Sequence, residues 1–89
     1  MEGTKVKAVL SQGYLVENET RSMKWLSDEP EEVGGSNLGP KPTELLLSAL
    51  ASCKLITVKM YASRKEWPLE DVEIELTIIE KGAPTIIEK

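Results

Sequence analysis

Hydrophobic and polar residues alternate loosely in three short segments at the start of the chain, which predicts three β-strands. Because these segments are short and closely spaced, we expect them to form an antiparallel meander. A loop rich in glycine, proline and acidic residues follows the third segment. The expected bounds are residues 5–10, 14–19 and 21–26 for the strands and 27–42 for the loop.

Two features of this loop could reflect either structure or ligand binding. Its acidic run, from Asp28 to Glu32, is interpreted as a solvated surface segment. The pair Gly34-Gly35 could let the backbone approach a ligand, but the phosphate-binding pattern G-x-G-x-x-G is absent. We therefore interpret these glycines as turn residues.

Apolar residues at helical spacing predict one long helix from Pro42 to about Lys65. Pro42 suits the first helical position, and Glu44 in the first turn favours the helix dipole. Roughly 24 residues would make a helix about 36 Å long. Its apolar residues extend well beyond a narrow stripe, so we expect burial on more than one side and more cover than three strands provide.

Beyond the helix, Pro68 prevents its continuation, and strict alternation from Val72 to Ile78 gives the clearest strand of the sequence. Turn residues at 81–84 precede another apolar segment that starts at Thr85. We expect residues 1–89 to form a single domain that is shortened at its C-terminus, because the chain stops as a strand begins.

Composition and charge argue against some classes of binding partner. The 89 residues carry a formal net charge of -4 and no basic stretch, so a nucleic-acid partner is not expected. No apolar leader opens the chain, which predicts a cytoplasmic protein. Polar residues interrupt the apolar helix, so no membrane span is expected. These interruptions are Ser48, Ser52, Lys54, Thr57 and Lys59.

The chemistry available to the chain is restricted. It contains no histidine and one cysteine, Cys53, so Ser-His-Asp triads, Cys-His pairs and internal disulfides are excluded. No metal and no cofactor are expected. Cys53 falls on an apolar helix face, where a free cysteine is often inert packing. A reactive thiol would need a nearby cation or hydrogen-bond donor, and neither Lys54 nor Lys59 has the i+3 or i+4 spacing to supply it.

Three segments resemble the OsmC/Ohr family, and in particular its YhfA-like branch. They are Gly39–Cys53, with its G-x-x-P loop leading into a cysteine-bearing helix, then Met60-Tyr61-Ala62, and then Trp67–Val72. The resemblance implies an α+β domain with a long buried central helix between sheets, assembled as an intertwined homodimer. A second chain would provide the cover that the apolar helix requires.

The resemblance also implies an activity, the reduction of organic hydroperoxides by a peroxidatic cysteine. Cys53 matches that cysteine by position, and an external thiol would act as reductant. Thr43 stands where the best-characterised peroxidases have Glu, so Glu44, one residue later, is a secondary candidate. The loop lacks the family's arginine, which leaves Arg21 as its substitute, and the family's second cysteine is not in this chain.

A second interpretation stays open. These departures from the family pattern also suit a non-catalytic or small-ligand-binding protein of the same fold, in which Cys53 is a buried structural cysteine.

Overall fold

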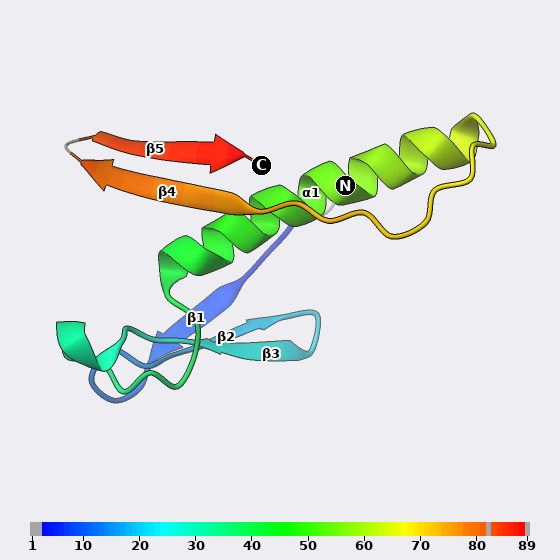
Figure 1. Cartoon of the computed structure of the whole chain (residues 1–89). Helices are drawn as coiled ribbons and strands as arrows, with labels where there is room; N and C mark the ends of the chain where they lie inside the picture. Colours follow the sequence, from blue (N-terminus) through cyan, green and yellow to red (C-terminus); the bar gives the residue numbers. More distant parts are fainter. Residues whose placement is uncertain (1–2, 82, 89) are drawn as a thin grey trace. The chain divides into compact units, whose positions relative to one another are not determined.

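The computed structural model describes residues 3–81 and 83–88, with side chains from residue 3 to residue 79. The chain is of the α+β class and divides into two compact units, Met1–Leu45 and Leu46–Lys89, which are considered separately. That residues 1–89 form a single domain stays a prediction. The elements are β1 (Lys7–Leu10), β2 (Val16–Thr20), β3 (Met23–Ser27), the 3-10 helix η1 (Glu31–Val33), α1 (Pro42–Arg64), β4 (Leu76–Lys81) and β5 (Ala83–Glu88) (Figure 1).

The first unit contains the antiparallel sheet β1-β2-β3, which confirms the predicted meander. The third strand begins two residues later than predicted. Arg21 and Ser22, expected within it, instead form the turn between β2 and β3, since Thr20 pairs with Met23. Both turn residues have a left-handed backbone, with φ of 47° and 71°. Two-residue hairpin turns require this conformation because it matches the twist of the flanking strands.

One face of this sheet is mostly apolar. Residues paired across neighbouring strands share a face, so Ala8 and Trp25 lie on it with Asn18 between them, and Leu10 and Val16 lie on it with Ser27. Leu10 remains exposed and Trp25 is half-buried. The first unit therefore presents a mostly apolar sheet face that its own residues cover only in part.

The loop after β3 is organised by Asp28, which is buried, with 2% of its surface exposed. Its carboxylate accepts backbone N–H groups from Glu29 at 2.7 Å and from Ser36 and Leu38 at 3.3 Å each. Its own N–H donates to the carbonyl of Pro40 at 3.1 Å. The prediction of a solvated acidic run is therefore wrong for Asp28, because the run's first carboxylate serves the loop's unpaired backbone donors.

Three glycines let the loop fold tightly. Gly34 has φ of 102° and donates its N–H to the carbonyl of Glu31, which confirms it as a turn residue. A Cβ on Gly35 would lie 2.5 Å from the carbonyl carbon of Glu29 and nearer still to the oxygen. A Cβ on Gly39 would lie 2.5 Å from the carbonyl oxygen of Leu26. These two glycines therefore serve a close approach of backbone to backbone.

Helix α1 confirms the predicted helix almost to the residue, but its burial differs from expectation. Ala62 is its one buried residue, with 5% exposed. Among the described residues, α1 is the helix that is long and apolar enough to cross a membrane, so its polar residues do not by themselves exclude a span, and the absence of a membrane partner stays a prediction. The core helix of a soluble protein passes the same test.

Helix α1 ends in a Schellman motif. Glu66 takes the left-handed position with φ of 59° and donates its N–H to the carbonyl of Ser63 at 3.1 Å. The N–H of Trp67 reaches back to the carbonyl of Ala62 at 2.8 Å. The Trp67 ring meets Tyr61 edge to face, with ring centroids 5.6 Å apart. The apolar contact that usually accompanies this motif is therefore an aromatic pair.

Strands β4 and β5 form an antiparallel pair whose bounds differ from the sequence prediction. The alternating pattern predicted a strand from Val72, but β4 begins at Leu76, which pairs with Glu88 at the end of β5. Residues 72–75 have no partner in β5, and alternation alone does not make a ladder. Strand β5 begins at Ala83, two residues earlier than predicted. Gly82, in the predicted turn, lies outside the described residues.

We predict that Gly35→Ala lowers the free energy of unfolding by about 1–3 kcal/mol, because the new methyl group has to displace the Glu29 carbonyl. Urea denaturation followed by circular dichroism measures this difference. Gly3→Ala is the matched control, since no atom lies within 4 Å of a Cβ built there. Equal stability of the two variants would show that the loop does not hold this close contact in solution.

We predict that Glu66→Gly raises the free energy of unfolding by about 0.5–1 kcal/mol, because glycine adopts the left-handed conformation without steric cost. Thermal unfolding of the two proteins measures the change. Glu73→Gly serves as control, since Glu73 is likewise exposed but is not in the left-handed region. A lower stability of Glu66→Gly than of the parent would contradict the Schellman geometry.

Candidate functional site

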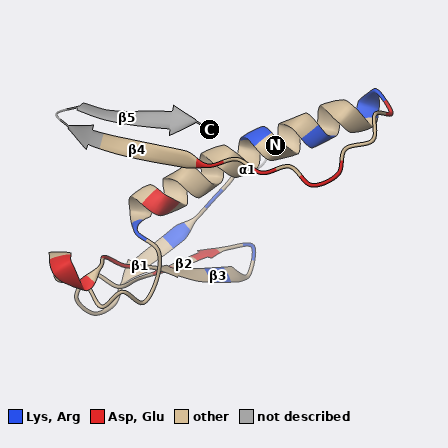
Figure 2. Cartoon of the chain, viewed as in Figure 1, with Lys and Arg blue, Asp and Glu red and all other residues tan. Residues whose placement is uncertain are grey.

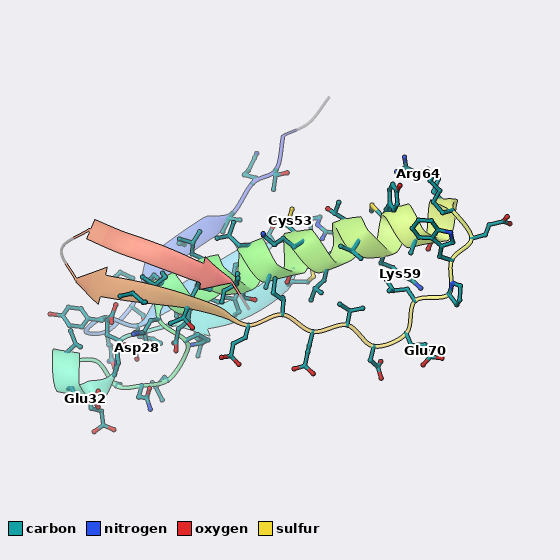
Figure 3. All side chains as sticks on the ribbon, turned by 45° about the horizontal axis from the view of Figure 1, so that its top comes forward. Asp28, Glu32, Cys53, Lys59, Arg64 and Glu70 are labelled. Atoms are coloured by element: carbon teal, nitrogen blue, oxygen red, sulfur yellow. The ribbon has the colours of Figure 1, made fainter. Side chains whose placement is uncertain are left out.

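Cys53 lies near the middle of α1 and is exposed. Figure 3 shows its side chain on the side of the helix away from Glu70 in the segment that follows. Within the single chain, Cys53 is therefore not the buried structural cysteine of the second interpretation. An exposed thiol is open to attack a soluble substrate, which a core cysteine is not.

The helix surface around Cys53 is apolar. Residues three and seven positions away along a helix share a face with it. At these positions stand Leu46, Leu50, Ile56 and Met60, all exposed, with 54% of Ile56 and 60% of Met60 open to solvent. Cys53 is thus the one reactive group at the centre of an apolar strip, here called the Cys53 face and defined by these five residues.

The opposite side of α1 is partly covered. Its half-buried or buried positions are Leu47, Ala51, Leu55 and Ala62. The chain turns back after the helix, and the Nζ of Lys59 donates to the carbonyl of Leu69 at 3.4 Å. Figure 3 places Lys59 and Glu70 on the same side of the helix, away from Cys53. The returning segment therefore leaves the Cys53 face open.

The electrostatic surroundings of Cys53 are sparse. Its neighbours at i±3 and i±4 are Ala49, Leu50, Ile56 and Thr57, and of these only Thr57 carries a polar group. The basic residues of α1 lie in the second half of the helix (Figure 2). None of these four positions carries a cation that would stabilise a thiolate.

Glu44 has a structural role at the start of α1. Its Oε1 accepts the backbone N–H of Lys41 at 2.8 Å, and the carbonyl of Lys41 accepts the N–H of Leu45 at 3.0 Å. Lys41 is therefore the N-cap residue, Pro42 the first helical residue, and Glu44 the third, where a carboxylate closes one half of a capping box. This contact accounts for Glu44 without a substrate, and its part in catalysis stays a prediction.

Arg21 lies in the turn between β2 and β3, in the first compact unit, whereas Cys53 lies in the second. The proposed assistance of Arg21 to Cys53 stays a prediction. Arg21 was expected in a strand, whereas the structure places it in a turn.

The role of Asp28 in binding backbone N–H groups of the loop was not predicted from the sequence. The available signal was an Asp placed directly after a strand and before Pro30, a pattern in which the side chain often binds backbone N–H groups of a turn. Beside it lies a cavity of about 440 Å³. Its lining is mostly apolar and consists of Leu10, Tyr14, Val16, Val33 and Pro42 with Ser27, Asp28 and Glu29. Cys53 does not line this cavity.

Among the described residues, no group of three or more Cys, Asp or Glu side chains is placed to hold a metal ion. The family model described as OsmC-like protein matches residues 34–88. Comparison with curated proteins gives no match, and comparison with solved structures gives none either. The matched range contains the glycine loop, all of α1 and Cys53.

We predict that Glu44→Ala lowers the free energy of unfolding by about 0.5–2 kcal/mol through loss of the cap, and leaves the reactivity of Cys53 unchanged. Denaturation measures the first effect, and the rate of alkylation of the thiol measures the second. Thr43→Ala, one residue earlier in the same turn, is the control for helix content. A strong fall in thiol reactivity at full stability would instead place Glu44 in the reactive site.

Proposed function

Because this chain belongs to the OsmC-like protein family, we propose that it is a thiol-dependent peroxidase that reduces organic hydroperoxides. Cys53 is the nucleophile of this proposal. The observation that carries it is the position of the chain's one thiol, exposed at the centre of an apolar helix face. Family membership supplies the class of chemistry, and the Cys53 face supplies the reactive atom.

The reaction proceeds by displacement at oxygen. The thiolate sulfur attacks the terminal peroxide oxygen, an S–O bond forms and the O–O bond breaks. The leaving alkoxide takes a proton and departs as an alcohol, while sulfur is oxidised to a sulfenic acid. An external thiol then condenses with the sulfenic acid, releases water and forms a mixed disulfide. A second thiol reduces this disulfide and regenerates Cys53.

The surroundings of Cys53 favour an organic substrate. Contact with Leu50, Ile56 and Met60 removes apolar surface from water, which is worth about 25 cal/mol per Å². An alkyl or aryl hydroperoxide gains this contribution, and hydrogen peroxide has no apolar group to bury. The apolar face therefore acts by holding the organic group while the peroxide oxygen meets sulfur.

The partners follow from the same surfaces. With one cysteine in the chain, the reductant is a separate thiol. A homodimer in the cytoplasm completes the proposal, since a second copy can cover part of the Cys53 face and bring a cation to the thiolate while the sulfur stays open to the peroxide. The apolar cover and the cation are needed together, because apolar surroundings alone disfavour the charged form of a thiol.

One observation favours a second function. The cavity of about 440 Å³ in the first unit has an apolar lining and a size within the range of small-molecule sites. A small-ligand-binding protein of this fold would use that cavity and leave Cys53 unoxidised. The state of Cys53 after exposure to peroxide separates the two functions.

We predict that cumene hydroperoxide converts Cys53 to a sulfenic acid faster than hydrogen peroxide does at equal concentration, since only the former buries apolar surface. Intact-mass spectrometry with a sulfenic-acid trap measures the rate for each peroxide. Ile56→Ser, beside the thiol, is expected to slow the reaction with cumene hydroperoxide several-fold and to spare that with hydrogen peroxide.

Two controls accompany this measurement. Cys53→Ser shows that trapping occurs at this thiol, and Val72→Ser removes an exposed apolar residue outside the Cys53 face. A folded protein whose thiol resists both peroxides, and reacts only after denaturation, would eliminate the peroxidase and leave the ligand-binding function.

A further inference from the structure

A cavity of about 680 Å³ lies between the start of β1 and the turn that joins β2 to β3. Three cationic side chains line it, from Lys5, Lys7 and Arg21, together with one carboxylate, Glu19. Its local charge is therefore about +2, in a chain whose net charge is -4. The hydroxyl-bearing lining residues are Thr4, Thr20 and Ser22.

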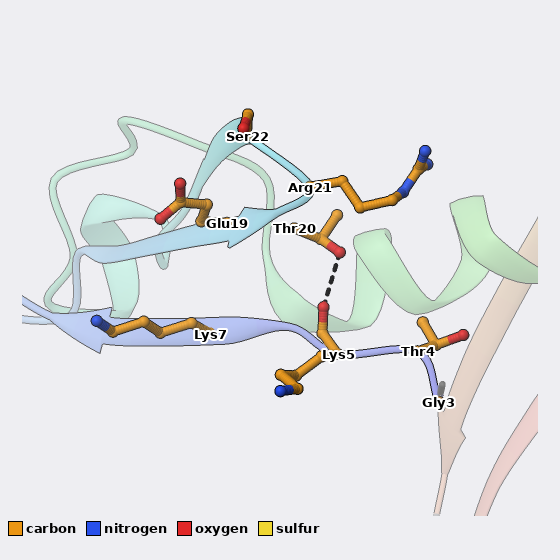
Figure 4. Close-up of a pocket in the computed structure, with 8 residues that line it drawn as sticks. All are labelled: Gly3, Thr4, Lys5, Lys7, Glu19, Thr20, Arg21 and Ser22. Carbon is orange, nitrogen blue, oxygen red and sulfur yellow. Dashed lines mark hydrogen bonds between the residues drawn. The ribbon is translucent and has the colours of Figure 1, made fainter. Parts of the chain in front are cut away.

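These cations come from two neighbouring segments of the first unit. Lys7 pairs with Glu19, and Lys5 and Arg21 each lie two residues beyond this pair, outside the paired strands. All three line the same cavity. The hydroxyl of Thr20 donates to the carbonyl of Lys5 at 2.7 Å and fixes this part of the chain beside the turn (Figure 4).

Like charges that line one cavity repel one another. In the described part of the chain, Lys5, Lys7 and Arg21 form no ion pair with a carboxylate. Their charges are thus available to an anion from solution. Arginine and lysine also have the geometry for phosphate oxygens, since guanidinium binds two of them at once and ammonium acts as a point charge.

The turn itself gives an independent observation. Arg21 and Ser22 both occupy left-handed backbone positions, which cost roughly 1–2 kcal/mol per residue for side chains other than glycine, asparagine or aspartate. Asn-Gly would make the same turn at lower cost. Strained residues of this kind concentrate where a ligand is held. A turn without this backbone strain would have residue types other than Arg21 and Ser22 at these two positions.

We propose that this cavity binds a phosphate group, free or as the monoester of a small molecule, through Lys5, Lys7 and Arg21 with the hydroxyl of Ser22. A phosphate monoester carries about -1.5 to -2 charges at neutral pH, which matches the local charge of the cavity. A carboxylate carries one charge and fewer acceptor oxygens. The volume falls within the usual range for small-ligand sites, so there is room for an organic group beyond the phosphate.

Titration of isotope-labelled protein with inorganic phosphate, methyl phosphate and methyl sulfate tests the proposal by amide NMR. We expect saturable shifts at Lys5 and at residues 20–22 with both phosphates, and weaker binding of the monoanionic sulfate. Tighter binding of methyl phosphate than of inorganic phosphate would identify an ester as the ligand, and the reverse would identify free phosphate. Absence of saturation with every phosphate would overturn the proposal.

Arg21→Asn is the decisive variant, because asparagine favours the left-handed turn while removing the cation. We expect it to be as stable as the parent or more so, and to bind phosphate at least about tenfold more weakly. Lys24→Gln is the matched control, a strand lysine of the same sheet outside this cavity. Equal losses in the two variants, or full binding by Arg21→Asn, would overturn the site. Cys53→Ser should bind phosphate normally, which keeps this test separate from the peroxidase.

Discussion

The apolar surface of α1 is the constraint on which the rest of this molecule depends. A helix of 23 residues carries leucine, isoleucine, valine and methionine around its circumference, and Ala62 is its one buried residue. Apolar area left in water forgoes about 25 cal/mol per Å² of stabilisation. The returning segment after the helix covers one side only. A second copy of the chain, as proposed, is the simplest way to cover the Cys53 face.

The same constraint bears on the chemistry of Cys53. A thiol reacts as its thiolate, which requires a cation or hydrogen-bond donors, and the helix dipole acts only near the ends of a helix. The middle of α1 offers neither. A cover made of side chains from a second copy would therefore have to combine apolar contact for the substrate with a charge for the sulfur. That combination ties the proposed activity to assembly of the protein.

Local patterns carried most of the fold prediction, because they depend on neighbours in sequence. Alternation gave the meander, and helical spacing gave α1 within one residue of its observed end. Alternation failed from Val72 to Glu75, where a strand needs a partner that a local pattern does not specify. The left-handed turn at Arg21 and Ser22 was missed because neither residue favours that conformation.

The candidate site was predictable to a lesser degree. The sole cysteine and its apolar helix face could be identified from residue types and spacing, and the structure shows that the face is open. Burial of Asp28 could not be identified this way, because it depends on N–H groups from residues eight and ten positions further along. Sequence separates residues that a compact loop brings together, so acidic runs are easily mistaken for solvated surface.

Charge is distributed so that the two proposed sites differ in kind. Acidic residues concentrate on η1 and on the segment after α1, and the Cys53 face carries no charged residue (Figure 2). The cavity beside the β2–β3 turn, in contrast, is lined by three cations and one carboxylate. An anion there interacts by charge and an organic peroxide on α1 by apolar contact. Since salt screens the first interaction and does not screen the second, ionic strength can weaken anion binding without weakening the apolar contact.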